Sequence, residues 1–123
     1  MAIYRDTVTI LQSRDYGEGD RIITLFGRRQ GKFTVIAKSV QKITSRKRGH
    51  VQTFSITNVT CAEGKSLDVL VEAESTFVLD ANDMDTVGYE RIGFAAFVTK
   101  NFLAERVQER EIFDLWVRYI TSD

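Results

Sequence analysis

Positively charged side chains are concentrated in one stretch of this 123-residue sequence. Side chains of this type could bind phosphate groups. Residues 21–62 contain nine lysines and arginines and no aspartate or glutamate. The nine are Arg21, Arg28, Arg29, Lys32, Lys38, Lys42, Arg46, Lys47 and Arg48. Clustered cations repel one another unless a polyanion or an acidic surface neutralises them. The stretch therefore predicts a phosphate-binding surface, although charge alone leaves open an uneven solvated surface.

The rest of the chain balances this charge, because the formal net charge is zero. Residues 1–65 hold twelve Lys and Arg against five Asp and Glu, whereas residues 66–123 hold five against twelve. A phosphate chain is attracted by the first part and repelled by the second. We therefore expect the N-terminal part to bind a polyanion and the C-terminal part to serve another purpose.

Residues that could perform catalysis or hold a metal form no recognisable set. His50 is the single histidine, and Cys61 is the single cysteine, so neither an internal disulfide nor a four-cysteine zinc site can form. A buried, space-filling role is expected for Cys61. Asp80, Asp83 and Asp85 are better explained as caps of a following helix than as a cation site. We expect a binding module with no enzymatic activity, no metal and no cofactor.

No long apolar run occurs in the sequence, and the first residues do not show a charged leader followed by an apolar segment. A membrane-spanning helix needs about 20 predominantly apolar residues. The pattern predicts a cytoplasmic chain that makes no contact with a membrane.

Strands are expected to position the cations. Apolar, β-branched or aromatic residues recur at every second position in five stretches, residues 7–12, 24–26, 32–38, 54–61 and 67–71. In the first stretch Val8, Ile10 and Gln12 share one face. In the third, Lys32 and Lys38 point outward. A change of phase near Asn58 predicts a β-bulge in the fourth.

The connections between these strands suggest a fold. The turn at residues 16–20 contains Gly17 and Gly19, which are expected to supply backbone angles that other residues resist. Only the connection at residues 39–50 is long. Five short strands with one long connection after the third match the Greek-key barrel of the oligonucleotide-binding (OB) fold. The predicted fold class is mainly β, with a five-stranded OB-fold barrel over residues 1–80 followed by two α-helices in a helical segment over residues 81–123.

Helical periodicity replaces the strand pattern after residue 80. Apolar residues return at three- and four-residue steps over residues 84–103, up to Phe102 and Leu103, and again over residues 109–121. The second helix places Phe113 and Trp116 on one face. So many aromatic side chains need a large apolar partner, which could be the barrel, a second copy of the chain or a further domain. We expect the helical segment to dock on such a partner, with self-association as one outcome.

The predicted barrel gives a set of candidate DNA contacts. They are Arg14, Arg28, Arg29, Lys32, Lys38, Lys42, Arg46, Lys47 and Arg48. The turn that carries Arg28 and Arg29 is expected near the same rim as the long basic loop. Cations beside a β-face are typical of proteins that follow single-stranded nucleic acid without reading its bases. The aromatic residues of the basic stretch are expected in the core, which leaves Tyr16 and His50 as candidates for base stacking.

Several motifs resemble the start of the bacterial RecO family of recombination mediators. They are RDYGEGDRI at residues 14–22, YRD at 4–6, GK at 31–32 and VIAKSV at 35–40. The resemblance covers residues 3–80. It implies an OB fold, binding to single- and double-stranded DNA, annealing of complementary strands, and cooperation with RecR and single-stranded-DNA-binding protein in loading RecA. RecO proteins continue into a larger helical domain that often holds a four-cysteine zinc motif. This sequence has no C-x-x-C pair, so zinc is not expected.

Two other classes of function remain open at the level of sequence. An RNA-binding barrel would follow phosphates in the same way, since only contacts to 2′-hydroxyls distinguish the sugars. A protein-interaction adaptor could use the basic face to bind an acidic partner.

Overall fold

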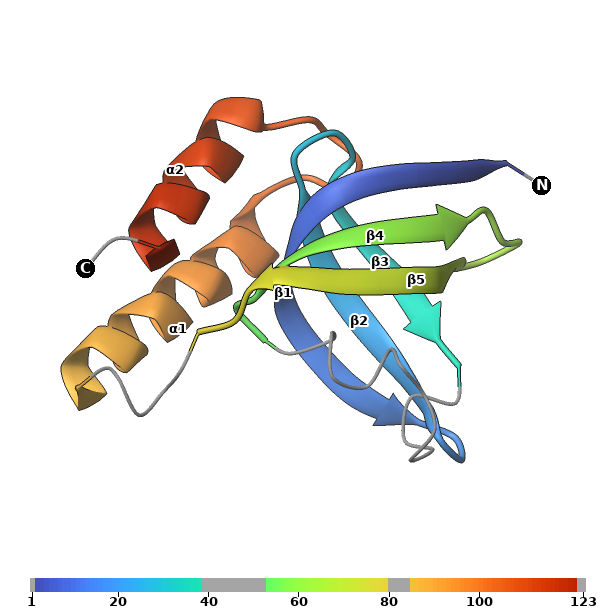
Figure 1. Ribbon diagram of the computed structural model, residues 1–123, viewed down its shortest axis with the longest axis horizontal. Helices are drawn as coiled ribbons and strands as arrows, with labels where there is room; N and C mark the ends of the chain where they lie inside the picture. The colour runs from blue at the N-terminus through green and yellow to red at the C-terminus, as the bar shows by residue number, and fades with distance from the viewer. Residues whose placement is uncertain (1, 39–52, 80–84, 122–123) are drawn as a thin grey trace.

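A five-stranded barrel with two helices packed on it forms the described part of the chain (Figure 1). The computed structural model describes residues 2–38, 53–79 and 85–121. The elements are β1 (Ile3–Tyr16), β2 (Asp20–Gly27), β3 (Gly31–Ala37), β4 (Ile56–Ala62), β5 (Asp68–Phe77), α1 (Thr86–Phe102) and α2 (Arg110–Thr121). The strands close in the order β1-β2-β3-β5-β4, and β1 also pairs with β4. Only the β3–β5 pair is parallel, as in an OB-fold barrel, and the predicted fold class is confirmed.

The barrel interior is built by the strand alternation that the sequence predicts. Phe33, Val35 and Ala37 of β3 are fully buried and pack with residues of the other four strands. Cys61 is buried in the same cluster, so its predicted space-filling role is confirmed. Lys32 and Lys38 lie outside this interior because successive side chains on a strand point to opposite faces.

β1 departs from simple alternation. The register between β1 and β2 shifts between Ile10 and Gln12, so Leu11 is an extra residue on β1. Ile10 points into the barrel, while Leu11 packs against the helices, and Gln12 is exposed. The prediction that Gln12 shares the inward face of Val8 and Ile10 is therefore wrong. Because the helices cover the outer side of the barrel here, Leu11 is buried on the outer face of β1.

The bulge expected near Asn58 lies on the neighbouring strand. β4 pairs with β1 in an unbroken register, whereas the pairing of β4 with β5 shifts twice, with an extra residue on β5 each time. The extra residues are Val71 and Thr76. Ile56 belongs to the cluster beneath the helices and Val59 to the barrel interior. The apparent change of phase in β4 therefore reflects burial on both faces of the strand.

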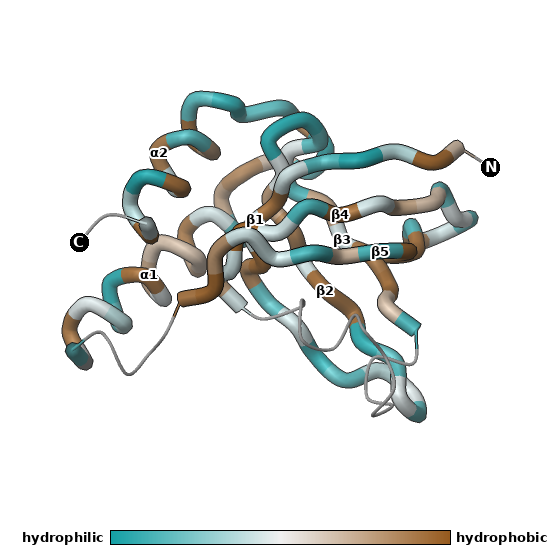
Figure 2. The backbone as a smooth tube through the Cα atoms, in the orientation of Figure 1, coloured by the Kyte–Doolittle hydropathy of each residue, from teal (hydrophilic) through white to brown (hydrophobic). Residues whose placement is uncertain are grey.

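The helices and the barrel share a second hydrophobic core. It consists of Leu11, Phe26, Phe54 and Ile56 from the barrel with Ile92, Ala96, Phe113, Trp116 and Ile120 from the helices. Figure 2 shows hydrophobic segments alternating with hydrophilic ones along both helices. The rings of Phe26 and Phe113 lie 5.6 Å apart, centroid to centroid, in an edge-to-face arrangement. Fully burying each such side chain stabilises the fold by about 1.5–3 kcal/mol, so the barrel is a main partner of the helices.

The start of α1 agrees with the prediction from the sequence, whereas its end does not. The Asp85 carboxylate accepts a hydrogen bond from the Gly88 N–H at 2.7 Å, which confirms Asp85 as the helix cap. Asp80 and Asp83 lie outside the described residues. Phe102, expected on the packed face, is exposed at the end of the helix, and Phe94 of α1 is 69% exposed. None of the described helices is long and apolar enough to cross a bilayer.

Candidate nucleic-acid interface

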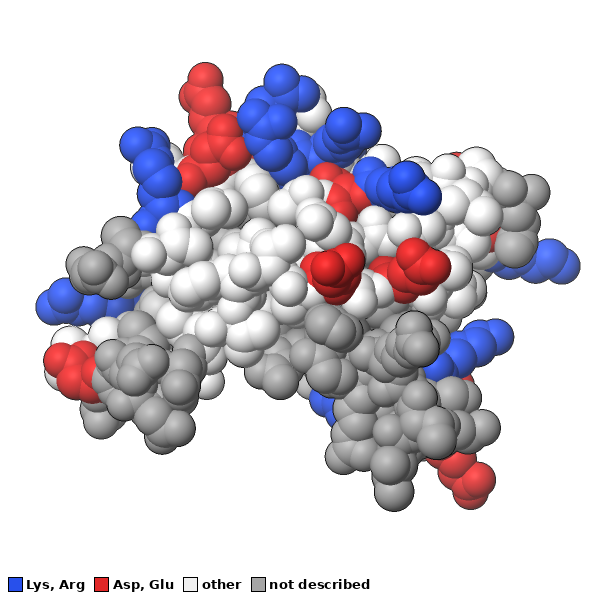
Figure 3. All heavy atoms as spheres, viewed as in Figure 1, with Lys and Arg blue, Asp and Glu red and all other residues white. Residues whose placement is uncertain are grey.

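Charges are divided between two sides of the barrel. The strands β1, β2 and β3 and their turns carry seven cations against four acidic residues. The cations are Arg5, Arg14, Arg21, Arg28, Arg29, Lys32 and Lys38, and the acidic residues are Asp6, Asp15, Glu18 and Asp20. The β4–β5 hairpin carries four acidic residues, Glu63, Asp68, Glu72 and Glu74, against the single cation Lys65. In Figure 3 acidic groups lie over β4 and β5, whereas Lys and Arg side chains follow the edge formed by β1 and the β2–β3 turn. A phosphate chain would meet less repulsion on the β1–β2–β3 side.

Arg14 and Lys38 lie at one end of this side. Arg14 on β1 is paired with Ile22 on β2, which is paired with Ile36 on β3. Lys38 follows the last residue of β3. Both cations are exposed, and neither forms an ion pair with another residue of the described ranges. Both are therefore available to a ligand.

Arg28 and Arg29 lie at the opposite end of β3, in the turn from β2 to β3. The seven residues of β3 separate this turn from Lys38, a span of about 20 Å at the rise of a strand. The loop itself lies outside the described residues, so the prediction that this turn lies near the same rim as the loop stays a prediction.

A buried carboxylate holds this turn in place. Asp6 is 5% exposed and accepts hydrogen bonds from the backbone N–H groups of Thr7, Arg29 and Gln30, at 2.8–3.2 Å. Charge-assisted bonds of this kind are stronger than neutral ones. The Arg28 guanidinium is paired with Asp114 of α2 at 3.0 Å, while Arg29 is exposed without an ion pair inside the described ranges. The turn thus presents Arg29 to solvent and uses Arg28 to hold α2.

Lys32 has a structural partner. Its Nζ donates to the Lys100 carbonyl oxygen at 2.5 Å, near the C-terminal end of α1. A cation at this end of a helix satisfies an unpaired carbonyl and complements the helix dipole. The Lys100 Nζ in turn donates to Gln12 Oε1 at 3.0 Å on β1. The structure therefore commits the Lys32 ammonium to helix packing, which the outward position of Lys32 in the sequence pattern does not indicate.

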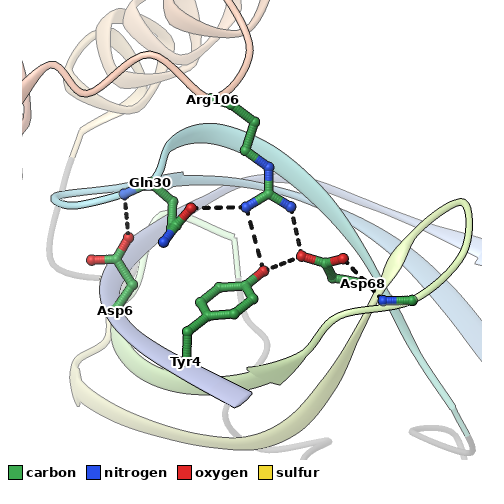
Figure 4. Close-up of polar contacts among 6 residues, drawn as sticks. Tyr4, Asp6, Gln30, Asp68 and Arg106 are labelled. Carbon is green, nitrogen blue, oxygen red and sulfur yellow. Dashed lines mark hydrogen bonds and ion pairs between the residues drawn. The ribbon is translucent and has the colours of Figure 1, made fainter. Parts of the chain in front are cut away.

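The segment between the helices is anchored to the barrel by Arg106, a residue that sequence reasoning missed. The Arg106 N–H donates to the Lys32 carbonyl oxygen at 2.9 Å. Its guanidinium donates to Asp68 Oδ2 at 2.6 Å and to Gln30 Oε1 at 3.0 Å (Figure 4). It also lies 4.7 Å from the centroid of the Phe33 ring. No motif marks Arg106, because its contacts lie on strands far away in the sequence.

The contacts around Arg106 shift the pKa values of Tyr4 and Asp68. The Tyr4 hydroxyl donates to Asp68 Oδ2. Burial, followed by this bond to a carboxylate, raises the pKa of Tyr4 well above its usual range. Burial alone would raise the pKa of Asp68, but the bonds from Tyr4, Arg106 and the Gly64 N–H hold that pKa below its ordinary value. Asp68 is therefore an ion at neutral pH and holds Arg106 as its counter-ion.

The remaining candidates fall outside this geometry. Lys42, Arg46, Lys47, Arg48 and His50 lie outside the described residues. Tyr16 is exposed at the end of β1, two residues after Arg14. Within the described ranges, no three His, Cys, Asp or Glu side chains are grouped so that they could hold a metal ion.

Comparisons with known proteins agree with this architecture. A family model for the N-terminal part of recombination protein O matches residues 1–78, which include all five strands. The DNA repair protein RecO of Pelotomaculum thermopropionicum is 37% identical over 102 residues, which cover 81% of this chain and 38% of the relative. The RecO protein of Heliobacterium modesticaldum is 43% identical over 74 residues, covering 60% of this chain and 27% of the relative.

A third relative matches nearly the whole chain. The DNA repair protein RecO of Desulforamulus reducens is 32% identical over 120 residues, covering 94% of this chain and 45% of the relative. The chain spans less than half the length of these curated relatives. The matched segments include both the barrel and, in this relative, the helices packed on it. Since the family model covers more than half of the sequence, the chain belongs to the recombination protein O (RecO) family.

Proposed function

We propose that this chain is a DNA-binding module of a recombination mediator in DNA repair. The observation that carries the proposal is the division of charge on a barrel of the RecO family, with unpaired cations on the β1–β2–β3 side and acidic residues on β4 and β5. Arg14, Arg29 and Lys38 are the described members of the predicted contact set that remain free to meet phosphates. Arg28 and Lys32 are engaged within the fold.

The proposed mode of binding is electrostatic and independent of base sequence. Lysine and arginine contacts to phosphates position a protein on nucleic acid without reading its bases. Arg14 and Lys38 are joined in this proposal by Lys42, Arg46, Lys47 and Arg48 of the following loop, whose charges are known from the sequence. Six phosphate contacts give a plot of log affinity against log salt with a slope of about −4 for a single strand.

Family membership also supports a set of partners for the whole protein. We propose that a protein carrying this module binds both single- and double-stranded DNA, anneals complementary strands, and acts with RecR and single-stranded-DNA-binding protein in loading RecA. The relatives are named as DNA repair proteins, which supports this proposal. In such an assembly with DNA and partner proteins, the acidic helices would contact proteins and not DNA, since their negative charge repels a phosphate chain.

The test is a titration of labelled single-stranded DNA, duplex DNA and RNA at several salt concentrations. Both DNA forms should bind with a steep salt dependence. The double substitution Arg14→Gln with Lys38→Gln should weaken binding to every DNA sequence alike and reduce the salt slope for single strands by about 1.4, because two phosphate contacts are lost.

Lys65→Gln provides the matched control. Lys65 is an exposed lysine on the acidic β4–β5 hairpin, so its removal changes the net charge of the chain by one unit without touching the proposed surface. Its effect on the slope should be near zero. Binding that does not depend on salt, or a slope that falls equally in the control and the double variant, would refute the proposed surface. Tighter binding to RNA than to DNA would favour the RNA-binding alternative.

A further inference from the structure

Tyr16 is an exposed aromatic residue on the basic side of the barrel, and the proposed phosphate contacts do not include it. Residues 2–38, all of which the structure describes, contain four aromatic side chains. Phe26 and Phe33 are buried, and Tyr4 is half-buried and bonded to Asp68. Tyr16 is 52% exposed, and it makes neither a ring contact nor a side-chain hydrogen bond within the described ranges. Its ring is free to pack against a ligand.

Tyr16 stands beside the two cations proposed to meet phosphates. It is the last residue of β1, and because side chains alternate along a strand it shares the outward face with Arg14. It is paired across the hairpin with Asp20 of β2. Lys38 follows β3 at the same end of the sheet. Tyr16 therefore lies at the end of the sheet that also carries Arg14 and Lys38, and aromatic side chains near cations are typical of proteins that bind single-stranded nucleic acid.

Bonds on the other face of the hairpin hold in place the backbone that carries this ring. The Arg21 guanidinium donates to Ser13 Oγ and to Asp15 Oδ1, both at 2.6 Å. These bonds join β1 to β2 and neutralise the Asp15 carboxylate. The turn itself uses Gly17 and Gly19, whose φ angles of 60° and 87° are strained for other residues. The backbone that carries the ring is therefore already ordered before a ligand binds, which lowers the entropic cost of binding.

We infer that Tyr16 is a stacking platform for an unpaired base, with Arg14 and Lys38 on the neighbouring phosphates. The inference rests on the proposed function, because it adds a base contact to a surface proposed for the backbone. Stacking tolerates any sequence because every base has a π-face. Both faces of a base are covered inside a duplex, so Tyr16 favours single strands.

The experiment separates bases from phosphates in the ligand. Binding of the full chain to a labelled single-stranded oligonucleotide is compared with binding to an abasic strand of the same length, which keeps the phosphates. Tyr16→Ala should weaken binding to the base-bearing strand by about 5- to 150-fold and leave binding to the abasic strand unchanged. Tyr16→Phe keeps the aromatic face and should bind as the unmodified chain does. Phe94→Ala removes an exposed aromatic side chain of α1 and should have no effect.

The outcomes distinguish this inference from the proposed function. If Tyr16→Ala binds the base-bearing strand as tightly as the unmodified chain does, or weakens both strands equally, the stacking role is wrong while phosphate binding stands. A loss in Tyr16→Phe equal to that in Tyr16→Ala would show that the hydroxyl is the contact and would also overturn stacking. If the unmodified chain binds neither strand, the proposed function and the inference both fail.

Discussion

Removing the Arg106 side chain should loosen the connection between the barrel and the helices. The Arg106 guanidinium is 41% exposed, but its partner Asp68 is only 12% exposed, so Arg106→Ala leaves a largely buried carboxylate without its counter-ion. Asp68 keeps the Tyr4 hydroxyl and the Gly64 N–H as hydrogen-bond donors. The expected result is a less stable fold in which the segment between α1 and α2 leaves the barrel first.

The magnitude follows from the contacts that are lost. A hydrogen bond to a charged group contributes about 1.5–3 kcal/mol. The exposure of the guanidinium places the bond to Asp68 at the low end of this range, because solvent screens exposed pairs. The position of the guanidinium over the Phe33 ring adds about 0.5–1 kcal/mol. We therefore expect a loss of about 2 kcal/mol in the free energy of unfolding.

A second substitution separates the side chain from the backbone. Arg106 has a φ angle of 60°, a conformation that favours glycine. Arg106→Gly removes the same contacts but relieves the backbone strain, so it should be more stable than Arg106→Ala by up to about 1 kcal/mol. Urea unfolding is the assay. The emission of Trp116, the single tryptophan, follows the packing of α2, and far-UV circular dichroism follows the whole fold.

Acid titration gives an independent check on the same contact. The folded-state pKa of Asp68 lies below its ordinary value of 3.8, so the stability it contributes is present above that value and is lost as the pH falls through the folded pKa. Arg106→Ala should therefore lose less stability than the unmodified chain between neutral pH and the acid limb. Equal unfolding midpoints for Arg106→Ala and the unmodified chain at neutral pH would refute the proposed anchor, and so would parallel acid profiles.

Two further predictions concern buried groups of the barrel. Asp6→Ala should lower the free energy of unfolding by about 2–3 kcal/mol in chemical denaturation, since three backbone N–H groups lose their charged acceptor; a loss below 0.5 kcal/mol, the usual range for surface sites, would contradict this. Burial is the main cause that raises the pKa of Cys61 from 9.0 to about 11, so its contribution to stability is present below 9.0 and is lost as the pH rises toward 11. Cys61→Ala should show a shallower alkaline loss in unfolding midpoint than the unmodified chain, and identical alkaline slopes would contradict that role.

Local patterns were sufficient for most of the barrel. Phe33, Val35 and Ala37 alternate with polar residues, and this alternation alone predicts a strand with its buried face. The glycines at positions 17 and 19 predict a turn with left-handed backbone angles, which the structure confirms. These predictions succeed because each depends on residues only a few positions apart. Alternation failed at Gln12, because Leu11 is an extra residue on β1, and near Asn58, because Ile56 of β4 is buried beneath the helices.

The candidate site was predictable only in part. Its residue types and their enrichment in one stretch are visible in the sequence, whereas the exposed position of Arg14 on a strand is not, because the predicted strand ends at residue 12 and β1 continues to Tyr16. Which of these cations are already engaged is a property of contacts across the fold. Arg28 meets Asp114 from 86 positions away, and the Lys32 ammonium meets the Lys100 carbonyl from 68 positions away. Patterns among neighbouring residues cannot reveal contacts between residues so far apart in the sequence.

The sequence by itself determined the OB-fold barrel, its two helices and the separation of basic from acidic halves, because strand alternation, helical spacing and net charge are carried by neighbouring residues. Only the tertiary structure decided which charges remain available. It pairs Arg28 and Arg106 with carboxylates, places the Lys32 ammonium at the end of α1, and leaves Arg14, Lys38 and the ring of Tyr16 exposed at one end of the sheet. The physical reason is that a side chain far along the chain can satisfy a charge only after folding brings the two together.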